Sequence, residues 1–180
     1  MPTRALLTYS DYAALPDDGR RYELHHGELS VTPAPGTRHQ EAIVNLIWLL
    51  LQHVRSRGLG KVFVAPTDCI LSNVTVVQPD VFYIATDRLT IISDRAIEGA
   101  PTLVVEVLSP STAHLDRGRK MTLYAEHGVP YYWIVDPESC SVEAYTLTGA
   151  AYALAGRVTG EPAALPPFSD LTVDPASLWS

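Results

Sequence analysis

The run Leu-Val-Val-Glu-Val-Leu at residues 103–108 predicts a strand that is apolar on both faces. Such strands are typical of the centre of a sheet that is covered on both sides. A helix is expected next, beginning between Thr112 and Asp116 and ending at Gly128, and a second apolar strand follows at residues 131–135. Two strands joined by a helix predict a right-handed parallel crossover. We therefore expect an α/β fold with a mixed sheet flanked by helices.

A long helix is expected upstream of this unit. Residues 38–57 carry apolar side chains at helical spacing, and Gly58 is expected to end the helix. Trp48 on this helix and Trp133 on the second apolar strand are both expected in the core. The other expected elements are a short capped helix from Thr8 to about Leu15, a hairpin of strands 21–25 and 28–32 around His26-Gly27, strands at 62–65, 69–71 and 74–84, an ambiguous segment at 87–98, and an edge hairpin around 142–146. Pro162, Pro166 and Pro167 predict an irregular tail.

Length and composition favour one cytoplasmic domain. A chain of 180 residues suits a single domain over residues 1–180, with a core at about 37–147. The net charge of −7 argues against a general nucleic-acid coat, although a nuclease with a local basic stripe remains compatible with it. No apolar run approaches the ~20 residues that span a bilayer, and no secretory signal is evident. Two cysteines, Cys69 and Cys140, form no disulfide framework or metal-type pair.

Glu106 is the most informative residue, because it interrupts the buried strand. A buried carboxylate is costly unless it is paired, protonated or bound to a metal. A structural ion pair with an arginine, or a place at the polar end of the strand, is the alternative explanation.

Asp80 is a second carboxylate in an apolar, strand-like context, directly after Pro79. Proline there suggests a strand start, an edge or a bulge, where the backbone can aim a side chain. An ordinary turn aspartate is the alternative. If Asp80 and Glu106 come from neighbouring strands near one end of the sheet, their oxygens suit Mg²⁺ or Mn²⁺.

Lys120 is one of only two lysines, beside eleven arginines. It lies on the helix expected directly after the strand that carries Glu106. Arg117, Lys120 and Tyr124 are expected to share one face of this helix. A lysine there could orient an attacking water or stabilise charge on a phosphate. A solvated basic face is the alternative.

Taken in order, these residues resemble the Pro-Asp…(Asp/Glu)-X-Lys signature of the restriction-endonuclease-like (PD-(D/E)XK) nuclease superfamily, and more closely a bacterial restriction-endonuclease-like family within it. The resemblance covers roughly residues 8–147. The matching stretches are Tyr-Glu-Leu-His-His-Gly-Glu-Leu at 22–29, His39 at the start of the long helix, Gln-Pro-Asp-Val at 78–81, Val-Glu-Val-Leu-Ser-Pro-Ser-Thr at 105–112, Asp-Arg-Gly-Arg-Lys at 116–120 with Tyr124, and Gly-Val-Pro-Tyr-Tyr-Trp-Ile-Val-Asp-Pro at 128–137.

The resemblance implies a helix-strand-strand-strand-helix-strand core, here with an extra N-terminal hairpin. It also implies a metal ion, Mg²⁺ or Mn²⁺, held by Asp80, Glu106 and the Val107 carbonyl. Leu108 stands where the superfamily signature has lysine, and Lys120 on the following helix is its replacement in this family. The other candidate site residues are His39, as a base or a supporting residue, and Glu23, with less defined matches at Glu28 and Glu41.

The function that this resemblance implies is metal-dependent endonucleolytic hydrolysis of DNA. Arginines beside the site would hold the DNA backbone, and a homodimer would allow both strands to be cut. We expect that role of Arg38, Arg117 and Arg119, and we expect His25 and His26 to lie at the surface. Two other functions remain open: a non-catalytic module that binds nucleic acid or protein, and a hydrolase of small phosphate esters with a closed, small pocket.

Overall fold

The computed structural model describes residues 5–179. The helical elements are α1 (Tyr9–Ala13), α2 (Thr37–Arg57), the 3₁₀ helix η1 (Thr86–Ile91), α3 (Ala113–Leu115), the π-helical turn η2 (Asp116–Lys120), α4 (Met121–Glu126) and α5 (Pro175–Leu178). The strands are β1 (Arg21–His25), β2 (Glu28–Thr32), β3 (Gly60–Val64), β4 (Cys69–Ser72), β5 (Thr75–Val77), β6 (Val81–Ala85), β7 (Leu103–Val107), β8 (Tyr131–Asp136), β9 (Ser141–Thr148), β10 (Ala151–Val158), β11 (Ala163–Leu165) and β12 (Phe168–Val173).

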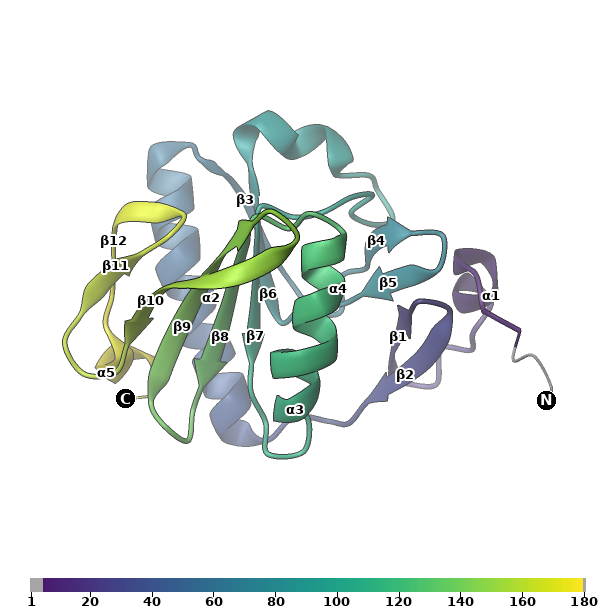
Figure 1. Cartoon of the computed structure of the whole chain (residues 1–180), viewed down its shortest axis with the longest axis horizontal. Coiled ribbons are helices and arrows are strands. Elements are labelled where there is room, and N and C mark those ends of the chain that lie inside the picture. Colours follow the sequence, from purple (N-terminus) through teal and green to yellow (C-terminus); the bar gives the residue numbers. More distant parts are fainter. Residues whose placement is uncertain (1–4, 180) are drawn as a thin grey trace.

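A six-stranded mixed sheet forms the centre of the molecule, in the order β10-β9-β8-β7-β6-β3 (Figure 1). Strands β7 and β8 are parallel, with Glu106 opposite Ile134, and β6 is antiparallel to β7. The predicted helix-strand-strand-strand-helix-strand order is therefore confirmed by α2, β3, β6, β7, the α3–α4 segment and β8. The long helix begins and ends within one residue of its predicted bounds, and Gly58 ends it with a positive φ of 62°.

Helices cover the two faces of this sheet. On one face, Leu46 and Leu50 of α2 pack in a cluster with Val105 of β7. On the other face, Leu123 and Tyr124 of α4 belong to a second cluster of buried residues. Val104 and Leu108, two positions before and after Glu106, also belong to this second cluster. Because side chains alternate along a strand, Glu106 faces the α4 side of the sheet.

A second, four-stranded sheet in the order β2-β1-β5-β4 lies beside the central one (Figure 1). The predicted single strand at residues 74–84 is wrong, because β5 belongs to this second sheet and β6 to the central sheet. The break falls at residues 78–80 and includes Pro79, which has no N–H for a sheet ladder. The chain crosses from one sheet to the other at Asp80.

The C-terminal segment differs from the expected irregular tail. Strands β11 and β12 form a hairpin, and Pro166 and Pro167 lie in its turn. Phe168, Val173 and Leu178 are buried in the cluster on the α2 side of the sheet. The prolines therefore mark a turn between paired strands.

Of the two predicted core tryptophans, only Trp133 is buried. Trp48 is 67% exposed, and the expectation for it is wrong. Position 48 is two residues from the buried Leu46 and Leu50, which is about half a helical turn away from them. Both cysteines are free. None of the helices within residues 5–179 has the length and apolarity that a membrane crossing requires.

Candidate active site

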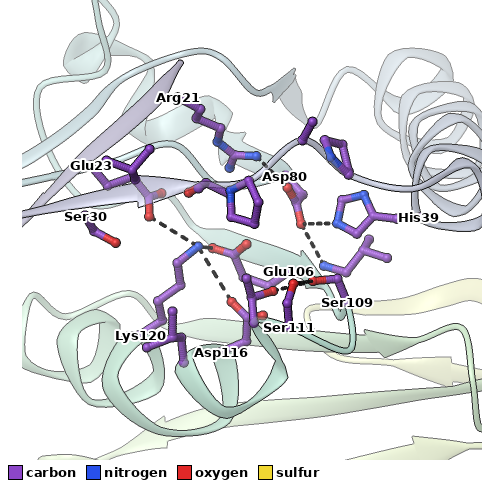
Figure 2. Close-up of a pocket in the computed structure, with 18 of the residues that line it drawn as sticks. Arg21, Glu23, Ser30, His39, Asp80, Glu106, Ser109, Ser111, Asp116 and Lys120 are labelled. Carbon is purple, nitrogen blue, oxygen red and sulfur yellow. Dashed lines mark hydrogen bonds and ion pairs between the residues drawn. The ribbon is translucent and has the colours of Figure 1, made fainter.

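A pocket of about 190 Å³ lies between β1, the start of α2, the end of β7 and the turn η2. Figure 2 shows its charged side chains pointing toward one another from these elements. Its lining includes Arg21, Glu23, His25, residues 30–36, His39, Asp80, Glu106, Val107, residues 109–112, Leu115, Asp116 and Lys120.

Strand β1 forms one wall of the pocket. Arg21, Glu23 and His25 alternate along the strand and all line the pocket, as the two-residue side-chain period of a strand requires. The hairpin turn that follows has φ values of 51° at His26 and 78° at Gly27. Positive φ at both central residues is the pattern of a tight two-residue hairpin turn, which fixes the register of β1 and β2.

Asp80 is 4% exposed and accepts hydrogen bonds at both carboxylate oxygens. Arg21 Nη1 lies 3.0 Å from Oδ1, and the Val107 amide N lies 2.9 Å from Oδ2. His39 Nε2 lies 3.3 Å from Oδ2, while its Nδ1 is buried and has no hydrogen-bond partner among residues 5–179. Burial raises the pKa of Asp80, but His39 and Arg21 outweigh it and hold the pKa far below its ordinary value. The side chain is therefore ionised.

Glu106 is 2% exposed and receives two donors at one oxygen. Lys120 Nζ lies 3.0 Å from Oε1, and the Tyr124 hydroxyl donates to the same atom at 2.6 Å. Burial raises the pKa of this carboxyl to about 8, because the opposing effect of Lys120 is smaller than the effects of burial and of the neighbouring carboxylates. Those neighbours include Asp80 and Asp116.

The π-helical turn η2 supplies the two remaining charges. Asp116 and Lys120 are both buried, and Lys120 Nζ lies 3.6 Å from Asp116 Oδ1. Lys120 Nζ also lies 3.5 Å from Glu23 Oε2, so three carboxylates surround one ammonium group (Figure 2). Burial would lower the pKa of Lys120, but Glu106, Glu23 and Asp116 raise it above its ordinary value. Single π-turns are frequent at functional sites.

Glu23 connects the second sheet to Lys120. Its carboxylate accepts the backbone N–H of Gln78 at 2.8 Å, and His25 Nε2 lies 3.2 Å from its other oxygen. Burial would raise the pKa of Glu23, but Lys120, His25 and Arg21 outweigh it and hold the pKa at about 2. This charged side chain fixes the position of β1 against the break before Asp80.

The charge balance of the pocket fits a hard divalent cation. Among the lining residues, four buried carboxyl groups, those of Glu23, Asp80, Glu106 and Asp116, face two permanent cations, Arg21 and Lys120. A bound divalent cation would favour the ionised form of Glu106, whose pKa burial raises to about 8. Within residues 5–179, no three His, Cys, Asp or Glu side chains form a complete ligand group. Mg²⁺ commonly uses only one or two carboxylates and keeps several waters. The donor set therefore suits such an ion with a shell completed by water.

The comparisons with known proteins point to the same family as the sequence motifs. A family model described as "Uma2: Putative restriction endonuclease" matches residues 9–176. The chain belongs to the Uma2 family. A solved structure, described as a putative nuclease belonging to DUF820 from Anabaena variabilis ATCC 29413, matches with a TM-score of 0.78 at 20% sequence identity. The match covers 96% of this chain and 97% of that one, and it shows a shared fold. The search of curated proteins gives no match.

The structure of this Uma2 chain brings five of the predicted residues to the pocket: Glu23, His39, Asp80, Glu106 and Lys120. Val107 also lines it, and its N–H points to Asp80. The N–H and C=O of a strand residue face the same neighbour, so the Val107 carbonyl lies on that side too. Glu41 is exposed and outside the lining, and Glu28 is exposed and pairs with Arg119 at 2.8 Å.

Two expectations about basic residues are wrong in this Uma2 chain. His25 is buried, whereas His26 is exposed. Arg117 pairs with Glu143 at 2.6 Å, so it does not share the inward face of Lys120 and Tyr124. Arg38 and Arg119 also have partners within the chain, since Arg38 donates to the Pro137 carbonyl and Arg119 donates to Glu28 and to the His25 carbonyl. The expected role of Arg38, Arg117 and Arg119 in holding DNA stays a prediction.

Two charged residues of the pocket, Arg21 and Asp116, were not predicted as site residues from the sequence. Arg21 shares a strand face with Glu23 and His25, and that alternation was a signal for it. Asp116 is four residues before Lys120, a spacing that places both on one helix face. The position of Arg21 on its strand indicates a site residue only when its buried partner Asp80 is known. The same holds for Asp116 and its buried partner Lys120.

Proposed function

We propose that the chain is a metal-dependent endonuclease that hydrolyses DNA phosphodiester bonds. The observation that carries this proposal is the approach of Lys120 to Glu106, at 3.0 Å, inside the pocket that Asp80 also lines. A lysine on a helix thus reaches the strand that bears the carboxylate. Membership of the Uma2 family supports the nuclease class of enzyme.

Asp80 and Glu106 are the proposed holders of Mg²⁺ or Mn²⁺, with the Val107 carbonyl as a third ligand. Such an ion polarises a phosphate oxygen and lowers the pKa of a bound water. Arg21 and His39 hold the Asp80 carboxylate in place, and Tyr124 does the same for Glu106. Lys120 carries a positive charge at the site, where it can stabilise the developing charge of the phosphate.

Metal binding separates this proposal from its main alternative. We propose titrating Mn²⁺ into the wild type, Asp80→Asn and Asp87→Asn by isothermal calorimetry. Asp87 is exposed and lies outside the pocket, so Asp87→Asn serves as a control variant that removes one carboxylate far from the proposed metal ligands. Binding that disappears only in Asp80→Asn supports the proposal. If the folded wild type binds no Mn²⁺ or Mg²⁺, the carboxylates are structural, and a non-catalytic binding module becomes the better account.

Two further features of this proposal are a homodimer and a cytoplasmic location. Sedimentation of the purified chain across a range of concentrations tests the first feature. Fractionation of the cells that produce the chain tests the second.

A further inference from the structure

The charged groups of the pocket lie deep. Asp80, Glu106, Asp116 and Lys120 are each no more than 6% exposed. The cavity above them, about 190 Å³, is below the ~300–1,000 Å³ of ordinary ligand pockets. The major groove of duplex DNA alone is about 12 Å wide, so an intact duplex is far larger than this cavity. A small cavity with buried charged groups favours a phosphodiester whose flanking nucleotides are free to bend, as they are in an unpaired strand.

Three arginines expected to hold DNA are engaged within the chain. Arg117 is paired with Glu143, Arg119 with Glu28, and Arg38 with the Pro137 carbonyl. The chain as a whole carries a net charge of −7. Binding to a duplex depends strongly on lysine and arginine side chains that neutralise its phosphates. The charges inside this pocket suit one phosphate group or a few.

The rim of the pocket has an apolar side and a hydroxyl side. Residues 33–35, Pro-Ala-Pro, are exposed and line it between β2 and α2. Ser109, Ser111 and Thr112 line it after β7, with Ser109 Oγ 2.6 Å from Thr112 Oγ1. Unpaired nucleotides expose base faces that pack on apolar surfaces, while hydroxyls donate to phosphate oxygens. Both sides of the rim therefore match a single strand.

We propose that this site takes an unpaired stretch of nucleic acid, with bases against residues 33–35 and a phosphate directed toward Asp80 and Glu106, in preference to intact duplex. The inference rests on the proposed phosphodiesterase function and specifies the substrate class of the same site.

The first test compares three substrates in Mg²⁺ and in Mn²⁺. They are a single-stranded DNA oligonucleotide, the same oligonucleotide annealed to its complement, and the small diester bis(p-nitrophenyl) phosphate. We expect kcat/KM for the single strand to exceed that for the duplex by on the order of tenfold or more. Equal or faster cleavage of the duplex overturns the inference. Hydrolysis of the small diester alone also overturns it, and indicates a hydrolase of small phosphate esters.

The second test changes the rim. Ala34→Asp places a negative charge beside the bound strand, and Ala150→Asp places the same charge on an exposed turn outside the pocket lining. We expect Ala34→Asp to slow cleavage of the single strand by a larger factor than hydrolysis of the small diester, while Ala150→Asp changes neither. Equal effects of the two variants on the single strand contradict the proposed path.

A binding measurement keeps the inference testable if no substrate is hydrolysed, which would be a failure of the proposed function. Fluorescence anisotropy with the same labelled oligonucleotides in Ca²⁺ then compares the single strand with the duplex. Tighter binding of the single strand, weakened by Ala34→Asp, supports the inference without catalysis. Equal binding of both, or no binding of either, overturns it.

Discussion

Lys120 Nζ lies 3.0 Å from Glu106 Oε1, although the two residues are fourteen positions apart and belong to different elements. Leu108, the position of the signature lysine in the wider superfamily, is buried in the apolar cluster on the α4 side of the sheet. The turn η2 brings Lys120 to that same side. The positive charge is therefore supplied from a helix, while the strand keeps its apolar packing.

Replacing Lys120 with methionine is expected to lower DNA hydrolysis by about 10²–10³-fold, because loss of one electrostatic donor at a reacting group has an effect of that size. Lys61→Met removes the other lysine, which is exposed on β3, and should leave hydrolysis unchanged. Initial rates of metal-dependent cleavage, measured on variants with native circular dichroism spectra, check this. Equal rates for the two variants would remove Lys120 from the mechanism.

The metal-free protein is expected to lose stability as the pH rises from about 4.5 to about 8. Burial raises the pKa of Glu106 from 4.5 to about 8, so the folded state favours the protonated carboxyl. The contribution of Glu106 to the free energy of unfolding is thus fully present below pH 4.5 and is lost as the pH rises through 8. Each pKa unit corresponds to about 1.4 kcal/mol, so a fall of a few kcal/mol is expected.

Urea unfolding in chelator at several pH values measures this fall. Glu106→Gln, which cannot ionise, should flatten the profile relative to the wild type. Saturating Mn²⁺ should restore stability at high pH to the wild type alone, because an ion that binds the folded state stabilises it. A Glu106→Gln profile parallel to the wild type would show that Glu106 is not the group responsible.

Glu23→Gln is expected to destabilise the fold by about 3 kcal/mol, the usual cost of removing one member of a buried ion pair. Glu23 is 1% exposed and lies near Lys120, His25 and Gln78. Glu98→Gln breaks the exposed pair with Arg95 and should cost less than about 1 kcal/mol. Chemical denaturation of both variants near pH 7 decides this, and similar losses in the two would contradict a stabilising role for Glu23.

The helix α2 and the central strands could be predicted from the sequence because their apolar residues repeat at regular spacing. The position of Trp48 follows from the same spacing, since it lies on the helix face opposite Leu46 and Leu50. The division of residues 74–84 between two sheets could not be predicted in this way. The segment is almost continuously apolar. Only Pro79 indicates the break between the end of β5 and the start of β6.

For the site, the motif pattern identified the residues that meet in the pocket but not their partners. Because one face of β1 is polar, His25 was expected at the surface. That prediction was wrong, since this face of β1 packs against Lys120 and Asp80. Likewise, the charge run at residues 116–120 contains both inward and outward side chains. Lys120 and Asp116 are buried, whereas Arg117 and Arg119 are exposed and paired with carboxylates.

The most direct test of the central claim is cleavage of circular DNA, which has no ends. Circular single-stranded DNA and supercoiled plasmid would be incubated with wild type and Glu106→Gln in Mg²⁺, Mn²⁺ or chelator. We expect the wild type to open circular DNA only in the presence of metal, and we expect Glu106→Gln to leave the DNA closed. Equal cleavage by both proteins, or no cleavage by folded wild type with either metal, would contradict the central claim.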